Sequence, residues 1–145
     1  MISGLGDMNL SLALAAVGSS LGTGIAGMAA IGAWKKAFVQ NKAAPFILIA
    51  FVGAPLSQTI YGMILRNAIQ KANLPPESYL YQMVIGFIGG FAIGASAYMQ
   101  GKAGARASDA LAETGKGFGQ YIMVLGVIET VALFVMVFCL SLIHI

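Results

Sequence analysis

Four long apolar stretches dominate this chain and limit what it can fold into. They run roughly from Met8 to Trp34, from Pro45 to Leu65, from Tyr79 to Gln100 and from Phe118 to Leu142, with the third free to continue further. A helix needs about 20 mostly apolar residues to cross a bilayer. Charged residues make up only 9% of the chain, whereas a soluble domain carries about 25%. The sequence therefore predicts an all-α membrane protein with four transmembrane helices.

Basic residues are distributed unevenly among the three connections between these stretches. The middle connection holds Arg66 and Lys71, and the first and third together hold six basic residues. Those six are Lys35, Lys36, Lys42, Lys102, Arg106 and Lys116. Cytoplasmic loops carry an excess of Lys and Arg. We therefore expect a multi-pass protein of the cell membrane, with the first and third connections in the cytoplasm and both termini outside.

Other features of the composition exclude several classes of function. The net charge is +3, and no basic stripe is interleaved with aromatic residues, so no nucleic-acid partner is expected. The single Cys139 excludes a disulfide within the chain, and no metal-binding cluster has the required spacing. The chain lacks a G-x-x-x-x-G-K-[ST] phosphate loop, so we expect it to bind no nucleotide and to catalyse no reaction itself.

The chain divides into two similar hairpins, residues 1–72 and residues 73–145. Each consists of a glycine-rich helix, a basic connection and a bulkier helix. Small residues recur every four positions in the glycine-rich helices, at Gly18 and Gly22 in the first and at Gly86, Gly90 and Gly94 in the second. This spacing lets helix backbones approach closely. We expect the first helices of the two hairpins to pack together, with the other two on a roomier side.

Two corresponding segments of the hairpins differ by one charge. The segment "LSQTIYGMI" carries Gln58 where "VIETVALFV" carries Glu129, and each residue is followed by a similar run. Glu129 is the one acid expected in the middle of a span. A charge there costs a few kcal/mol or more, so an ionisable residue inside a membrane is by default a functional hypothesis.

No basic residue is expected at the depth of Glu129, so its counter-charge must be a bound cation, or the carboxyl must be protonated. Oxygen groups able to approach it are those of Ser57, Gln58, Tyr61, Gln100 and the Ala54 carbonyl beside Pro55. A single membrane Gln or Ser more often links helices than binds a ligand. Several oxygens converging on one carboxylate favour a cation or proton site, built from parts of both hairpins.

Three segments carry a resemblance to a known family: "PLSQTIYG", "QGKAGA" and "VIETVAL". They resemble the proteolipid of V-type ion-translocating ATPases, which forms the rotor ring and is called c or K, and most of all its bacterial sodium-pumping members. The resemblance covers nearly the whole chain. It implies a homo-oligomeric ring with the first and third helices inside. The implied partners are identical copies, membrane lipid, a stator protein with half-channels and an arginine, and a central-stalk protein at the cytoplasmic loops.

The resemblance also implies a set of ligands for one Na+. They would be the Glu129 carboxylate, the Gln58 and Gln100 side-chain carbonyls, the Ser57 hydroxyl and the Ala54 backbone carbonyl, with Tyr61 hydrogen-bonded to Glu129 to lock the site. Ser57 stands where Thr is expected and Ala54 where Leu is usual, and neither departure removes a ligand atom. Rotation of the neutralised site would couple ion translocation to ATP hydrolysis or synthesis elsewhere in the complex.

Two alternatives to a sodium-carrying rotor stay open at this point. The first is the same rotor carrying H+, with the amides and hydroxyls forming hydrogen bonds around a protonated Glu129. The second is a small four-helix cation or drug antiporter that acts as a dimer. The tandem hairpins and the amide and hydroxyl neighbours of Glu129 count against the antiporter.

Overall fold

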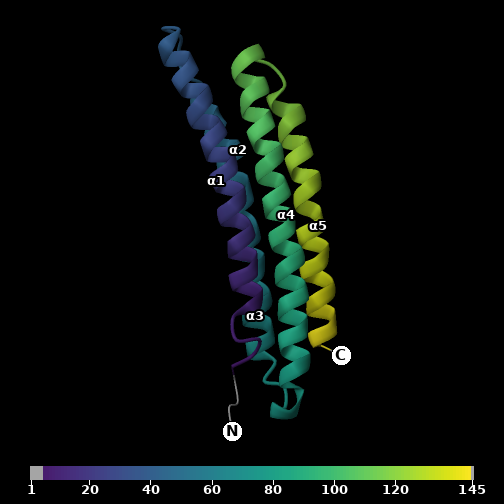
Figure 1. Cartoon of the computed structure of the whole chain (residues 1–145). Coiled ribbons are helices and arrows are strands. Elements are labelled where there is room, and N and C mark those ends of the chain that lie inside the picture. The colour runs from purple at the N-terminus through teal and green to yellow at the C-terminus, as the bar shows by residue number, and fades with distance from the viewer. Residues whose placement is uncertain (1–4, 145) are drawn as a thin grey trace.

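The computed structural model describes residues 5–144, which form four long helical tracks lying side by side (Figure 1). The first, third and fourth tracks are α1 (Leu10–Val39), α4 (Tyr79–Thr114) and α5 (Phe118–Ile143). The second track runs from Phe46 to Lys71 in several pieces. Each track is long and apolar enough to cross a membrane. The predicted all-α fold with four transmembrane helices is confirmed.

The second track changes its helical geometry halfway along. It comprises the 3-10 turn η1 (Phe46–Leu48), α2 (Ile49–Gly53), the 3-10 turn η2 (Ala54–Leu56) and α3 (Ser57–Lys71). Pro55 lies in η2 and has no backbone N–H, so it cannot form the α-helical hydrogen bond of its position. The tighter turn ends where Ser57 begins α3, and this position matters for the site described below.

The two ends of the molecule differ in what they contain. One end holds the α1–η1 connection, residues 40–45, and the short α4–α5 connection, residues 115–117 (Figure 1). Gly115 and Gly117 have φ of 65° and 97°, in the region that favours glycine, which allows so short a turn. At the other end, α1 begins, α5 finishes and the 3-10 turn η3 (Pro76–Ser78) leads into α4.

Six of the eight basic residues expected in connections lie on helices instead. Lys35 and Lys36 belong to the last turns of α1, Arg66 and Lys71 to the last turns of α3, and Lys102 and Arg106 lie well inside α4. The expectation that these residues occupy loops was wrong. The segments around them are rich in Ala, Lys and Arg, which are strong helix formers, so the helices continue beyond the apolar stretches.

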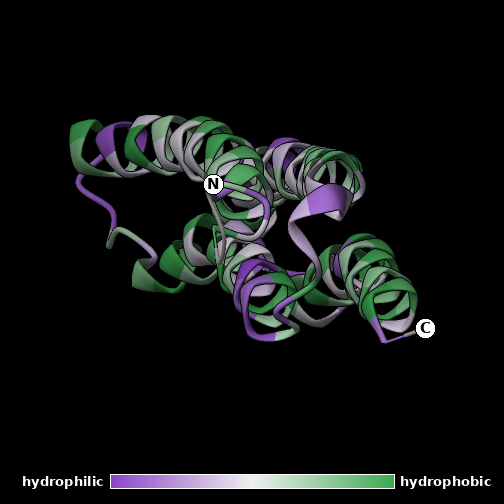
Figure 2. Cartoon of the chain, turned by 90° about the horizontal axis from the view of Figure 1, so that it is seen from below, coloured by the Kyte–Doolittle hydropathy of each residue, from purple (hydrophilic) through white to green (hydrophobic). Residues whose placement is uncertain are grey.

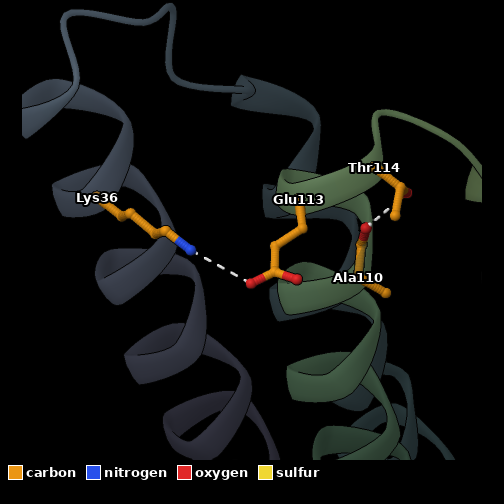
Figure 3. Close-up of polar contacts among 4 residues, drawn as sticks. All are labelled: Lys36, Ala110, Glu113 and Thr114. Atoms are coloured by element: carbon orange, nitrogen blue, oxygen red, sulfur yellow. Dashed lines mark hydrogen bonds and ion pairs between the residues drawn. The ribbon is translucent and has the colours of Figure 1, made fainter.

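An ion pair joins the extended ends of α1 and α4. Lys36 Nζ lies 3.2 Å from Glu113 Oε1, and the two side chains point toward each other across the gap between the helices (Figure 3). Both side chains are mostly exposed. An exposed pair of this kind contributes little to stability, so the packing of the two helices must come from their buried faces.

The buried faces of α1 and α4 meet backbone to backbone. A Cβ atom built on Gly18 would overlap the backbone of Gly94, and one built on Gly101 would overlap the backbone of Gly22. A Cβ on Gly90 would lie 2.7 Å from the Ser11 Cα atom. Such approach is possible only without side chains at the contact points.

Two apolar clusters occupy the ends of the bundle and leave a polar layer between them. One is built around Leu65, Ile93 and Cys139, and the other around Phe51 and Leu125. Seen along the helices, much of the ribbon has the colour of hydrophobic residues (Figure 2), and many large hydrophobic side chains are exposed. This distribution suits a bundle surrounded by lipid, and it leaves buried polar groups to satisfy one another within the layer.

We predict that Gly101→Ala destabilises the protein, because its new methyl group would meet the Gly22 backbone. Overpacking of this kind costs about 1–3 kcal/mol. The melting temperature of the detergent-purified protein should fall. Gly119→Ala is the matched control, since a Cβ there meets no described atom within 4 Å. Equal melting temperatures for the two variants would contradict the backbone contact.

Candidate functional site

The polar layer is centred on Glu129, which lies near the middle of α5 and is partly buried. Its Oε1 atom accepts hydrogen bonds from the Tyr61 hydroxyl at 2.9 Å and from Ser57 Oγ. Both donors belong to α3. They are four residues apart and therefore lie on one face of the helix. Tyr61 and Ser57 thus present two neutral hydroxyls to one carboxylate oxygen.

Three acceptor oxygens lie around the Ser57 hydroxyl, which has a single hydrogen to donate. Its Oγ atom lies 3.1 Å from the Ala54 carbonyl oxygen and 3.1 Å from Gln58 Oε1, besides its contact with Glu129. A hydroxyl group has one hydrogen to donate. The Ser57 hydroxyl can therefore donate a hydrogen bond to only one of these three acceptor oxygens. The cluster has an excess of lone pairs, which a cation or an additional proton would balance.

The two glutamines form a directed chain of hydrogen bonds behind this cluster. Gln58 Nε2 donates to Gln100 Oε1 at 3.0 Å, and Gln100 Nε2 donates to the Leu125 carbonyl at 2.8 Å. Both side chains are almost completely buried. The chain links α3, α4 and α5 at the depth of Glu129. It also brings the carbonyl end of Gln58 toward Ser57.

Ser96 on α4 belongs to the same network, and the sequence analysis missed it. Ser96 is buried. Its Oγ atom donates a hydrogen bond to the Ile128 carbonyl at 2.9 Å and accepts one from Gln58 Nε2 at 3.4 Å. Ser96 precedes Gln100 by four residues, so the two lie on one face of α4. The four-residue spacing is the only feature of the sequence that points to Ser96 as a partner of Gln100. It does not distinguish a site residue from an ordinary serine that links two membrane helices.

The predicted residues fall into two groups in the structure. Glu129, Ser57, Tyr61, Gln58 and the Ala54 carbonyl come together directly, and Gln100 joins them through Gln58. The glycines that the spacing singled out lie elsewhere, in contacts of α1 and α4. Gly18 meets Gly94, Gly22 meets Ala97, Gly90 meets Ser11, and Gly86 meets Asp7.

Asp7 is a second buried acid, and it lies just before α1 rather than within a span. It is only 1% exposed and packs over Gly86. Its carboxylate accepts hydrogen bonds from the backbone N–H groups of Asn9 and Ser11 and from the Ser11 hydroxyl. Free N–H groups at a helix start stabilise a carboxylate. Asp7 is therefore satisfied by backbone N–H groups at the start of α1, unlike Glu129.

One comparison with known proteins bears on this site. Residues 83–142 match the family model that describes the C subunit of ATP synthase. The matched segment covers most of α4 and nearly all of α5, including Ser96, Gln100 and Glu129. No curated protein matches the chain. The similarity thus falls on the second hairpin, which carries the carboxylate.

We predict that a lipid-soluble carbodiimide labels the chain at Glu129. Glu129 is partly exposed, between the exposed residues Val127 and Val131, whereas Asp7 is buried and fully hydrogen-bonded. Glu129→Gln should abolish labelling, as measured by mass spectrometry of the intact protein. Asp7→Asn is the matched control and should leave labelling unchanged. Residual labelling of the Glu129→Gln variant would place the reactive acid elsewhere.

Proposed function

Since residues 83–142 match the family of the ATP synthase C subunit, the rotor proteolipid, we propose that this protein is the ion-carrying rotor-ring subunit of a V-type rotary ATPase and binds one Na+ at Glu129. Members of the family are non-catalytic membrane proteins that bind the transported cation and form homo-oligomeric rings with ATPase partners. The V-type assignment and the identity of the ion are the two parts of this proposal.

The V-type assignment is supported by the doubled architecture. The family model covers a single hairpin, α4 and α5, and a second hairpin precedes it in the chain. In our proposal, residues 1–72 and 73–145 are duplicated units of one membrane domain. Gln58 and Glu129 then occupy corresponding positions. A ring of such chains would carry one carboxylate for every four helices.

The excess of acceptor oxygens around Ser57 is the observation that carries the ion-binding proposal. In our proposal, Na+ is held by the Glu129 carboxylate, the Ser57 hydroxyl, the Gln58 and Gln100 carbonyls and the Ala54 backbone carbonyl. Oxygen ligands suit a hard cation. Gln100 Oε1 accepts one hydrogen bond from Gln58, and a carbonyl oxygen has a second lone pair for the ion. Tyr61 would hold Glu129 in place.

The mechanism follows from the charge balance at Glu129. An ion from a stator half-channel neutralises the carboxylate, and the neutral site can then move through lipid at low cost. A stator arginine displaces the ion at the far side. Each charge that crosses carries about 2.3 kcal/mol per 100 mV. A central-stalk protein bound at the cytoplasmic connections would transmit the rotation.

A proton-carrying rotor is the second candidate, and the contact between Ser57 and Glu129 favours it. A protonated Glu129 would supply the additional hydrogen that the cluster lacks. The antiporter alternative has less support, because the family match is to a rotor protein.

We predict that Na+ slows carbodiimide labelling of Glu129 in the purified ring. Carbodiimides react with the protonated acid, and a bound cation keeps the carboxylate ionised. Potassium at equal ionic strength should not protect. Gln58→Leu and Gln100→Leu should each raise the sodium concentration needed for half-protection, because each removes a ligand oxygen. The labelling rate without sodium should change little.

The outcome separates the two candidate ions. If millimolar sodium leaves the labelling rate of the unmutated ring unchanged, the sodium proposal fails and the proton-carrying rotor takes its place. Glu129→Gln should abolish transport under either proposal.

We predict that the α1–η1 and α4–α5 connections face the cytoplasm. Cysteines placed at Gln40 and Lys116, both exposed, should react with a membrane-impermeant maleimide added from the cytoplasmic side, whereas one at Glu77 should not. The native Cys139 is buried and gives little background. Labelling of the Glu77 position from the cytoplasmic side would invert the proposed topology.

A further inference from the structure

We propose that Ser96 is a positioning residue for the ion site, holding the Gln58 amide so that its carbonyl oxygen stays on the side of Ser57, where the ion would bind. This inference rests on the proposed function and deepens it. Ser96 has no place in the ligand set, and among the described residues its hydroxyl bonds to Ile128 and Gln58 rather than to Glu129. It acts through the orientation of Gln58.

The Gln58 amide has two orientations that occupy nearly the same space but present opposite chemistry. With the carbonyl oxygen toward Ser57, it offers a lone pair to a cation. With the NH2 group there, it offers a hydrogen that repels a cation and attracts the Glu129 carboxylate. In the structure Oε1 lies 3.1 Å from Ser57 Oγ, and the NH2 group points to α4. Neighbouring groups must therefore hold the orientation in which the Gln58 carbonyl oxygen lies toward Ser57.

Two backbone carbonyls of α5 set the direction of the network. A carbonyl oxygen only accepts, so Gln100 must turn its NH2 group to Leu125, and Ser96 must direct its hydrogen to Ile128. Gln100 then presents an oxygen to Gln58, and Ser96 presents lone pairs.

Ser96 and Gln100 together use both N–H groups of the Gln58 amide. Gln100 Oε1 accepts at 3.0 Å and Ser96 Oγ lies at 3.4 Å. Gln58 is 0% exposed, so no solvent is available to either N–H. Without the Ser96 hydroxyl, one buried N–H loses its acceptor. A turn of the amide toward Ser57 and Glu129 would give that N–H an acceptor at the cost of the hydrogen bond to Gln100, and the NH2 group would then occupy the place of the ion.

The test compares the sodium protection of carbodiimide labelling in purified rings of unmutated protein and of Ser96→Ala. We expect the half-protecting sodium concentration to rise roughly tenfold, as for other residues that orient ligands. Labelling without sodium should persist, because Glu129, Ser57 and Tyr61 are unchanged, but at a lower rate, because a turned NH2 group that donates to the carboxylate favours its ionised form. Ser96→Thr keeps the hydroxyl and should keep the half-protecting concentration near that of the unmutated ring.

Ser108→Ala is the matched control. Ser108 lies on the same helix, is 0% exposed, and its hydroxyl has no hydrogen-bond partner among the described residues. Its removal should leave sodium protection unchanged. An equal shift in this control would show that loss of any buried α4 hydroxyl has the same effect, and would overturn the proposal.

A double variant tests whether Ser96 acts through Gln58. In a Gln58→Leu background the amide is absent, so Ser96→Ala should cause no further shift. An additive shift would overturn the positioning role.

If Ser96→Ala does not assemble, Ser96→Cys keeps a similar size with a weaker acceptor and should shift protection in the same direction. An unchanged half-protecting concentration in the variant that assembles overturns the inference alone, whereas absence of sodium protection in the unmutated ring overturns both proposals.

Discussion

A carboxyl group in the middle of a membrane span, surrounded by neutral oxygens, is the constraint on which the rest of this structure depends. Glu129 accepts hydrogen bonds from the hydroxyl groups of Ser57 and Tyr61, and neither group carries a charge. A buried carboxylate without a counter-charge is costly. In our proposal a bound cation or a proton neutralises the site. Asp7 shows the contrast, because helix N–H groups balance its charge.

The backbone of the second track is shaped to serve this constraint. Pro55 interrupts the α-helical pattern, and the 3-10 turn that results ends at Ser57. The Ala54 carbonyl therefore lies within 3.1 Å of the Ser57 hydroxyl. The Ala54 carbonyl, the Ser57 hydroxyl and the Gln58 side chain thus come from one short segment, which limits how far these three groups can move relative to one another.

The close packing of α1 on α4 has a different role. Backbone contact at Gly18 and Gly94 and at Gly22 and Gly101 brings the two helices together without side chains between them. The face of α4 that carries Ser96 and Gln100 is left to meet α3 and α5. Hydrogen bonds from that face to α5 carbonyls then hold the helices in register at the depth of Glu129.

The membrane class, the four spans, the mid-span acid and the polar residues near it could all be predicted from the sequence, because they follow from hydropathy, length and the cost of burying charge. The sequence did not reveal the extension of the helices through Lys36 and Arg106, since hydropathy marks the apolar stretch and helix propensity carries the backbone further. The burial of Asp7, the place of Ser96 in the network and the contact of the Gln58 oxygen with Ser57 became visible only in the folded molecule. Those features depend on which atoms of separate helices meet, and periodicity along one chain specifies the face of a helix but not its partner.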